Sequence, residues 1–233
     1  MYFCSVKTIA VILAGGTGSR MGVDTPKQFL TVNERCIIEY AIDAFEENEH
    51  IDEICAVVHP EWVEHMKYIV SCNEWSKFAK IVVGGEERYL SSWHAIQAYK
   101  DEPDDSLILF HDAARPLVSQ QLISGVVDAL SECRAAGVAI ASTDTIWHVS
   151  DGMIQDIPER CSLMRAQTPQ GFHLGIIREA YELALEDNHI RITDDCGMVK
   201  KYMPDVHIHV VEGDEHNIKI TYPSDLDLLK QKN

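Results

Sequence analysis

Up to residue 136 the chain alternates short runs of apolar residues with segments of helical periodicity, and this alternation constrains its fold most strongly. The apolar runs that indicate strands are Thr8–Leu13, Glu53–His59, Lys80–Val83 and Ser106–His111. The segments with helical spacing that follow them are Cys36–Asn48, Glu61–Cys72, Tyr89–Tyr99 and Gln120–Ala136. A repeated strand–helix order is typical of βαβ units, so we expect an α/β fold with a mainly parallel sheet.

After Gly137 the pattern changes to shorter and more polar strands. We expect Thr145–Val149 and Met153–Ile157 to form a hairpin around Ser150-Asp151-Gly152, because Asp-Gly is a strong hairpin-turn signal. An isolated two-stranded hairpin is marginally stable in water, so this arm, residues 143–162, should pack on a second subunit. Further elements are expected at Leu174–Leu185 (helix), Val206–Val211 (strand) and Pro223–Lys230 (helix). Without repeats or low-complexity tracts, residues 1–233 are expected to form a single domain.

The 233 residues carry a formal net charge of −17, which disfavours non-specific binding to nucleic acids and acidic membranes. Any anion site must therefore be locally basic. The seven cysteines are odd in number and include no C-x-x-C pair, so neither a disulfide framework nor a zinc knuckle is indicated. The apolar run at Ile9–Leu13 is too short to span a membrane. We expect a cytoplasmic protein with no nucleic-acid or membrane partner.

A glycine-rich loop, L-A-G-G-T-G-S-R-M-G at residues 13–22, follows the first predicted strand. Glycines allow backbone N–H groups to approach phosphate oxygens closely, so the loop indicates a phosphate site. It differs from the Rossmann fingerprint, because Met21 stands where the last glycine belongs, and it lacks the G-K-[ST] ending of a Walker A loop. By itself such a loop is also compatible with a simple turn.

Three charged residues strengthen the phosphate-site hypothesis. Arg20 lies within the loop, and Lys27 follows Pro26, which stiffens the chain that presents the ammonium group. Nucleotidyl transfer requires such cations, although a pair of surface charges would also fit the pattern. Asp112 ends an apolar strand, where open α/β sheets bind ligands, and one or two carboxylates suffice for Mg²⁺. Its alternative role is a helix cap or a partner of Arg115.

The order of these and other motifs resembles the bacterial 2-C-methyl-D-erythritol 4-phosphate cytidylyltransferase family. The matching segments are A-G-G-T-G-S-R-M-G, P-K-Q-F, H-D-A-A-R-P at residues 111–116, Q-T-P-Q at 167–170 and N-I-K-I-T at 217–221. They run in register over nearly the whole chain, and the related enzymes that make CDP-ribitol share most of them. The resemblance implies a Rossmann-like nucleotidyltransferase fold with a mixed sheet flanked by helices, CTP and an alditol phosphate as substrates, Mg²⁺ as cofactor, and a homodimer formed through the hairpin arm.

The resemblance also implies roles for individual residues. The residues expected to bind the nucleotide are Ala14, Gly15, Gly16, Thr17, Gly18, Gly85, Glu86, Arg88 and Ser91. Gly85 and Glu86 would contact cytosine through backbone groups, and at Glu86 the family often has Asp. The expected catalytic residues are Arg20, Lys27 and Lys219. The expected alditol-phosphate ligands are Asp112, which would also face Mg²⁺, Arg115, Thr145, Arg160, Thr168 and Thr221, with Thr145 and Arg160 reaching across the dimer interface.

The expected reaction is direct in-line attack of the alditol phosphate on the α-phosphorus of CTP. It needs no protein nucleophile and no general base, because a phosphate monoester is largely dianionic at neutral pH. His111 is therefore interpreted as a packing residue at the end of a strand. Methylerythritol phosphate is favoured by the H-D-A-A-R-P segment, whereas I-L-A-G-G at residues 12–16 and Trp147, in place of a basic residue, favour ribitol phosphate. A third hypothesis is a non-catalytic nucleotide-binding regulator.

Overall fold

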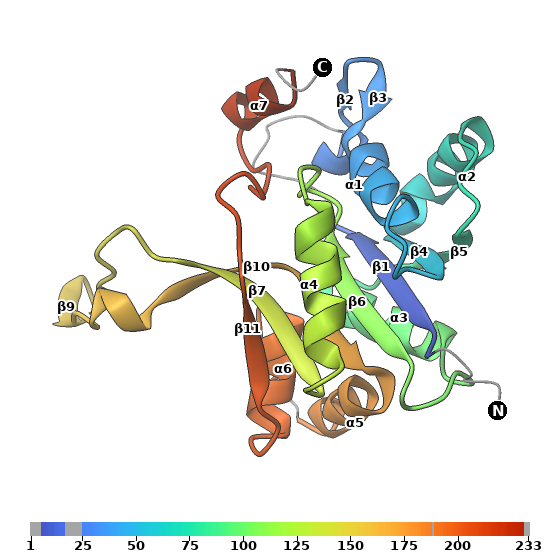
Figure 1. Cartoon of the computed structure of the whole chain (residues 1–233). Coiled ribbons are helices and arrows are strands. Elements are labelled where there is room, and N and C mark those ends of the chain that lie inside the picture. The colour runs from blue at the N-terminus through green and yellow to red at the C-terminus, as the bar shows by residue number, and fades with distance from the viewer. Residues whose placement is uncertain (1–5, 17–24, 188, 231–233) are drawn as a thin grey trace.

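The computed structural model describes residues 6–16, 25–187 and 189–230. Seven strands form one sheet in the order β11-β7-β10-β6-β1-β4-β5 (Figure 1). These strands are β1 (Thr8–Ala14), β4 (Glu53–Val58), β5 (Phe78–Val83), β6 (Leu107–Asp112), β7 (Ala135–Ala141), β10 (Met164–His173) and β11 (Ile208–Glu212). The α-helices are α1 (Ile37–Glu46), α2 (Val63–Cys72), α3 (Arg88–Ala98), α4 (Gln120–Leu130), α5 (Leu174–Leu185), α6 (Asp195–Tyr202) and α7 (Leu226–Lys230). A small hairpin, β2 (Thr31–Val32) and β3 (Arg35–Cys36), precedes α1.

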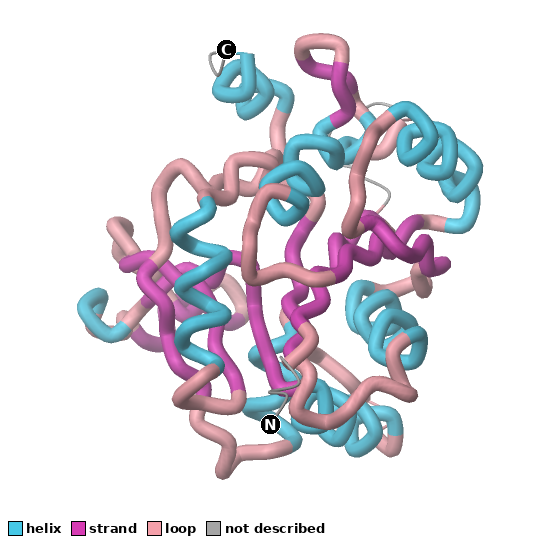
Figure 2. The backbone as a smooth tube through the Cα atoms, turned by 45° about the vertical axis from the view of Figure 1, so that its right-hand side comes forward, coloured by secondary structure: helices cyan, strands magenta, loops and turns pink. Residues whose placement is uncertain are grey.

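The sheet is mostly parallel, and helices cover both of its faces (Figure 2). Only β10 runs antiparallel to its neighbours, β6 and β7, so the sheet is mixed. Alternate residues of β1 explain the layering: Ile9 and Val11 pack with α3, α5 and α6, whereas Ala10 and Ile12 pack with α1, α2 and α4. Because both faces of β1 are buried, its sequence is apolar from Ile9 to Ala14, and the expected α/β class is confirmed.

The register of the central strands brings the carboxyl ends of β1 and β6 together. Leu13 pairs with Asp112, so the glycine loop leaves the sheet directly beside that carboxylate. Helix α3 begins at Arg88 at the same edge of the sheet, after the loop that follows β5. The sheet therefore places the start of the glycine loop, Asp112 and the first residue of α3, Arg88, next to one another.

Two parts of the sequence-based assignment need correction. The predicted helix Gln120–Ala136 ends at Leu130, and Ala135 and Ala136 begin β7 instead. This strand was hidden because A-A-G-V-A-I-A is rich in alanine, the best helix former, whereas in the sheet its small side chains fit between two layers of helices. Strand β10 and helix α6 were not predicted at all.

The arm protrudes from the body of the protein (Figure 1). Its strands β8 (His148–Ser150) and β9 (Met153–Asp156) are shorter than expected, and Thr145 precedes them without belonging to a strand. Ser150 pairs with Met153, and Asp151 and Gly152 have φ angles of 52° and 73°. Both turn residues are left-handed, as in a two-residue type I′ hairpin, which is the turn that Asp-Gly favours.

None of the helices in the described part of the chain is long and apolar enough to cross a membrane.

Candidate active site

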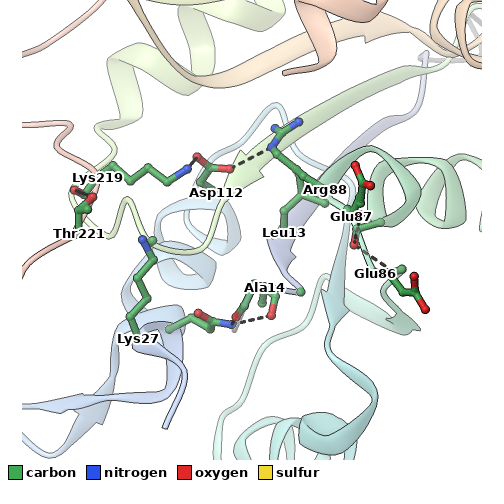
Figure 3. Close-up of a pocket in the computed structure, with 15 residues that line it drawn as sticks. Leu13, Ala14, Lys27, Glu86, Glu87, Arg88, Asp112, Lys219 and Thr221 are labelled. Carbon is green, nitrogen blue, oxygen red and sulfur yellow. Dashed lines mark hydrogen bonds and ion pairs between the residues drawn. The ribbon is translucent and has the colours of Figure 1, made fainter. Parts of the chain in front are cut away.

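Two cavities meet at the carboxyl ends of β1 and β6, and Arg88, Asp112 and Lys219 line both of them. The first cavity is further lined by Leu13, Ala14, Gly15, Gly16, Lys27, Gln28, Gly85, Glu86, Glu87, Ser91, Ala114 and Thr221 (Figure 3). The second is further lined by Arg115, Ala166, Gln167, Thr168, Gln170, Thr193 and Asp194. Two ligands bound in these cavities would therefore lie on either side of one carboxylate.

Asp112 is surrounded by cations. Its carboxylate lies 2.7 Å from the Lys219 ammonium, 3.6 Å from Arg88 Nε and 3.9 Å from Arg115 Nε. Burial alone would raise the pKa of Asp112, but Arg88, Lys219 and Arg115 together hold it well below its usual range. The carboxylate is thus ionised at neutral pH, and Asp112 spaces three positive charges around the junction of the cavities.

The segment that carries Lys219 is fixed by hydrogen bonds to distant parts of the chain. Arg115 Nη1 donates to the Asn217 carbonyl at 2.6 Å, and the Asn217 amide donates to the Thr168 carbonyl at 2.8 Å. The Ile220 N–H donates to the Ala114 carbonyl, and the Ile220 carbonyl accepts from Lys27 Nζ at 2.7 Å. Lys219 is therefore held against Asp112, and Lys27 against the segment that carries Lys219, before any ligand binds.

Two contacts fix the start of the glycine loop, one made by Gln28 and one between Gly15 and Ser91. Gln28, which is buried, donates from Nε2 to the carbonyls of Ala14 and Gly16, both at 2.7 Å. Gly15 lies so close to helix α3 that a Cβ on it would come within 2.9 Å of Ser91 Oγ. A glycine at position 15 thus allows the loop to pack against the Ser91 hydroxyl.

The same Ser91 hydroxyl organises the loop at residues 84–87. It accepts a hydrogen bond from the Gly85 N–H at 3.1 Å and donates to the Glu87 carbonyl at 3.3 Å. A Cβ on Gly85 would lie 2.3 Å from the Leu90 Cβ, so only glycine fits there without displacing the helix. Ser91 was expected near the nucleotide. In the structure its hydroxyl holds the backbone of Gly85 and Glu87, in the segment that was expected to contact cytosine.

His111 and Thr168 form a short hydrogen-bond chain under Asp112. The carbonyl of Arg115 can only accept, so His111 Nε2 donates to it at 3.0 Å, and Nδ1 accepts from the Thr168 hydroxyl at 3.0 Å. The Thr168 oxygen in turn accepts from the Asp112 N–H. Complete burial lowers the pKa of His111 to about 4, so the imidazole is neutral, as its interpretation as a packing residue requires. The proton of the Thr168 hydroxyl is already used within the protein.

The structure brings most of the predicted site residues together. The cavity with the glycine loop contains Ala14, Gly15, Gly16, Lys27, Gly85, Glu86, Arg88 and Ser91, with Thr221, which was expected to bind the alditol. Arg115 and Thr168 line the other cavity. Thr145 and Arg160 lie on the exposed arm and line neither cavity of their own chain, and Arg160 donates to the Thr143 carbonyl at 3.3 Å. Thr17, Gly18 and Arg20 lie outside the described residues.

Sequence reasoning missed several residues of the site. Gln28 stood inside the quoted P-K-Q-F motif, but its role depends on the backbone fold of the loop. Thr193 and Asp194 line the second cavity, and the buried Asp195 forms an ion pair with Arg88. The available signal was T-D-D before a short amphipathic segment, which is typical of a helix N-terminus: Asp194 accepts from the Gly197 N–H and caps α6.

Mg²⁺ would find few protein ligands at the junction of the cavities. Within residues 6–16, 25–187 and 189–230, no group of three or more His, Cys, Asp or Glu side chains is arranged to hold a metal ion. Asp112 supplies a carboxylate at the junction of the cavities, and it lies between cations. Because this carboxylate is already paired with Lys219 and Arg88, an ion bound beside it would take most of its oxygen ligands from a triphosphate and water.

Comparisons with known proteins agree with this geometry. The model of the family IspD, 2-C-methyl-D-erythritol 4-phosphate cytidylyltransferase, matches residues 8–231. The enzyme of that name from Thermobifida fusca is 42% identical over 94% of this chain and 90% of its own length. The bifunctional ribulose 5-phosphate reductase/CDP-ribitol pyrophosphorylase Bcs1 of Haemophilus influenzae is 40% identical over 94% of this chain and 47% of its own length.

Solved structures show the same fold. The 4-diphosphocytidyl-2C-methyl-D-erythritol synthase of Anaerococcus prevotii superposes with a TM-score of 0.84 at 28% identity, covering 97% of this chain and 98% of that chain. The Francisella tularensis 2-C-methyl-D-erythritol 4-phosphate cytidylyltransferase does so with a TM-score of 0.82 at 26% identity, covering 97% of this chain and all of the other.

Proposed function

Because this chain belongs to the 2-C-methyl-D-erythritol 4-phosphate cytidylyltransferase family, we propose that it transfers CMP from CTP to 2-C-methyl-D-erythritol 4-phosphate and releases pyrophosphate. The observation that carries the proposal is the pair of adjoining cavities that share Arg88, Asp112 and Lys219. The cavity with the glycine loop and the loop at 84–87 would take CTP, and the cavity with Arg115 and Thr168 would take the alditol phosphate. Membership of an enzyme family argues against the non-catalytic regulator.

The charges of the site support this assignment of ligands. Among the described residues, Lys27, Arg88 and Lys219 line the first cavity together with the carboxylates of Glu86, Glu87 and Asp112. A chain with a net charge of −17 thus still offers cations where a triphosphate would bind. The second cavity adds the charge of Arg115, whose Nη1 and Nη2 donate to the carbonyls of Asn217 and Ala166 and thereby fix the guanidinium at the cavity wall. Fixed cations of this kind stabilise the charge that builds up on phosphorus in the transition state, without reorganisation during the reaction.

The chemistry follows as a single displacement. A phosphate oxygen of the alditol forms a bond to the α-phosphorus of CTP, and the bond from that phosphorus to the bridging oxygen of the β-phosphate breaks. Pyrophosphate leaves with the electron pair, and Lys27 stabilises the charge on the reacting phosphoryl group. Bound Mg²⁺ would neutralise phosphate charge, with Asp112 as the carboxylate nearest to it. The neutral His111 needs to transfer no proton, because the attacking phosphate is already largely dianionic.

Ribitol 5-phosphate remains the second candidate substrate. A relative that is 40% identical carries the name CDP-ribitol pyrophosphorylase, and Trp147 stands where a basic residue was expected for the methylerythritol enzymes. Both substrates would require the same cavities and the same displacement.

The exposed arm supports a further part of the proposal, a homodimer. Val149 and Ile154 are cross-strand partners, and each exposes about half of its surface, at 50% and 49%. Trp147 and Met153 add exposed apolar surface on the same arm. A second copy that covers this surface would place Thr145 and Arg160 of one subunit beside the second cavity of the other.

The reaction can be tested by product identification. Purified protein incubated with CTP, Mg²⁺ and 2-C-methyl-D-erythritol 4-phosphate should produce one pyrophosphate for each CDP-methylerythritol, measured by coupled assay and mass spectrometry. Pyrophosphate release that is independent of the alditol phosphate, with CMP as the product, would indicate a CTP hydrolase and contradict the proposal.

A further inference from the structure

Asp195 is completely buried in the first turn of α6, yet it lies against a residue of the site. Its Oδ2 atom is 2.7 Å from Arg88 Nη2, and within the described part of the chain no group forms a hydrogen bond with that oxygen. Arg88 is therefore its counter-charge. A buried carboxylate is costly unless it is paired, so the position of Asp195 has to be explained together with that of Arg88.

Two hydrogen bonds fix Asp195 in addition to its ion pair with Arg88. The Tyr181 hydroxyl donates to Oδ1 at 2.7 Å, and the backbone N–H of Asp195 donates to Gln170 Oε1 at 3.0 Å. Tyr181 is itself buried and stacks on Trp93, with the ring centroids 6.2 Å apart. The carboxylate is thus held by α5 and β10 and has little freedom to follow Arg88 if the arginine moves.

The guanidinium of Arg88 is held between two carboxylates of different surroundings. Its Nη2 contacts Asp195, and its Nε lies 3.6 Å from Asp112 at the junction of the cavities. Figure 3 shows Arg88 on one side of Asp112 and Lys219 on the other. If Asp195 were absent, Asp112 would be the nearest carboxylate, and the guanidinium could close onto it and be neutralised there instead of pairing with a bound phosphate.

We propose that Asp195 is a positioning residue of the transfer reaction: it holds Arg88 at the wall shared by both cavities, so that the guanidinium faces the two phosphate groups. The inference rests on the proposed function and adds to it a residue that touches neither substrate. It also assigns a function to the T-D-D segment, since Asp194 caps α6 and lines the second cavity while Asp195 anchors Arg88.

The test is a double-mutant cycle between Asp195 and Arg88. Asp195→Asn keeps the size of the side chain and removes the charge. It should lower kcat/KM for both substrates by about 30-fold per folded molecule, since the ion pair with Arg88 is lost. In an Arg88→Met background the same substitution should change kcat/KM by less than about threefold, because Asp195 would act through Arg88. Tyr99→Phe is the matched control: it removes a hydrogen bond of the same kind, from a buried tyrosine hydroxyl to the Glu53 carboxylate, outside both cavities, and should retain nearly full activity.

Unfolding temperature and calorimetric binding of Mg·CTP separate this account from a purely structural one. A structural role predicts that Asp195→Asn lowers Tm while kcat/KM per folded molecule stays at the wild-type value, and that result would overturn the inference. Equal losses in the wild-type and Arg88→Met backgrounds would also overturn it. Wild-type protein that binds Mg·CTP without producing a CDP-alditol would contradict the proposed function. The positioning role would then still be supported if Asp195→Asn bound Mg·CTP more weakly than the wild type, while the same substitution left the Mg·CTP affinity of the Arg88→Met variant unchanged.

Discussion

Residues 111–115 and 217–221 are joined to each other and to Thr168 by hydrogen bonds, whereas the arm at 143–162 exposes almost every side chain. In the first region most polar groups find their partners within one chain, and the cavities are largely shaped without help from another molecule. The exceptions among the described residues are Arg115 Nε and Asn217 Oδ1, which are buried and form no hydrogen bond. In the second region apolar side chains lack cover from their own chain. The difference indicates that one chain shapes the two cavities, whereas the exposed apolar surface of the arm is what the proposed second subunit would cover.

The largest expected effect concerns the cavities at the carboxyl ends of β1 and β6. Lys27→Ala should lower kcat by roughly 10³-fold with little change in the affinity for Mg·CTP, because a fixed cation acts mainly on the transition state. Stopped-flow pyrophosphate release and calorimetry measure the two quantities. Lys67→Ala, at an exposed lysine on α2, is the control. Equal losses in turnover and in CTP affinity would refute the assigned role of Lys27.

A charge introduced on the arm tests whether its exposed apolar surface lies in a dimer interface. Ile154→Lys should raise the dimer dissociation constant by about 10³-fold, since each of two symmetric copies would lose about 2 kcal/mol of apolar burial. Analytical ultracentrifugation measures the shift, and Asp156→Lys, on the same strand, controls for charge alone. A monomeric wild-type protein at micromolar concentration would contradict the dimer.

The burial of His111 predicts how the stability of the folded protein changes at acid pH. Its pKa is about 4 in the folded chain and near 6.5 when unfolded, so the unfolded state binds more protons between these values. Stability from this group is fully present above pH 6.5 and is lost as the pH falls through 6.5 to 4, by about 3 kcal/mol over the window. Urea unfolding of wild-type and His111→Asn protein at pH 7 and 4.5 measures it. An equally steep pH dependence in His111→Asn would contradict this origin; His209→Asn, at an exposed strand residue, is the control.

The smallest expected effect joins the two regions. Arg160→Ala should raise the KM for the alditol phosphate by roughly tenfold and leave the KM for CTP nearly unchanged, because one charge-assisted contact is lost. Mixing Arg160→Ala with Lys27→Ala subunits sharpens the test. If the arm acts across the dimer, half of the sites in mixed dimers regain both residues and activity at low alditol phosphate rises. No recovery after verified subunit exchange would place Arg160 in its own subunit's site or outside any site.

The strand–helix order up to residue 130 could be predicted because buried parallel strands are continuously apolar, and so could the positions of Lys27, Asp112 and Lys219 at one edge of the sheet. Strand β10 could not, because M-R-A-Q-T-P-Q-G-F-H carries polar and turn-forming residues whose partners, such as Asn217 for Thr168, come from distant segments. Asp195 was missed for the same reason: a buried carboxylate is meaningful only once Arg88 is seen beside it.

Transfer of CMP to an alditol phosphate, and the identity of that alditol phosphate, can be tested in one measurement. It is kcat/KM for pyrophosphate release from CTP and Mg²⁺, with 2-C-methyl-D-erythritol 4-phosphate and D-ribitol 5-phosphate in parallel. We predict turnover with both CTP and an alditol phosphate present and a higher kcat/KM for the methylerythritol substrate. A preference for ribitol 5-phosphate would keep the reaction and reassign the substrate, and the absence of turnover with either would contradict the account.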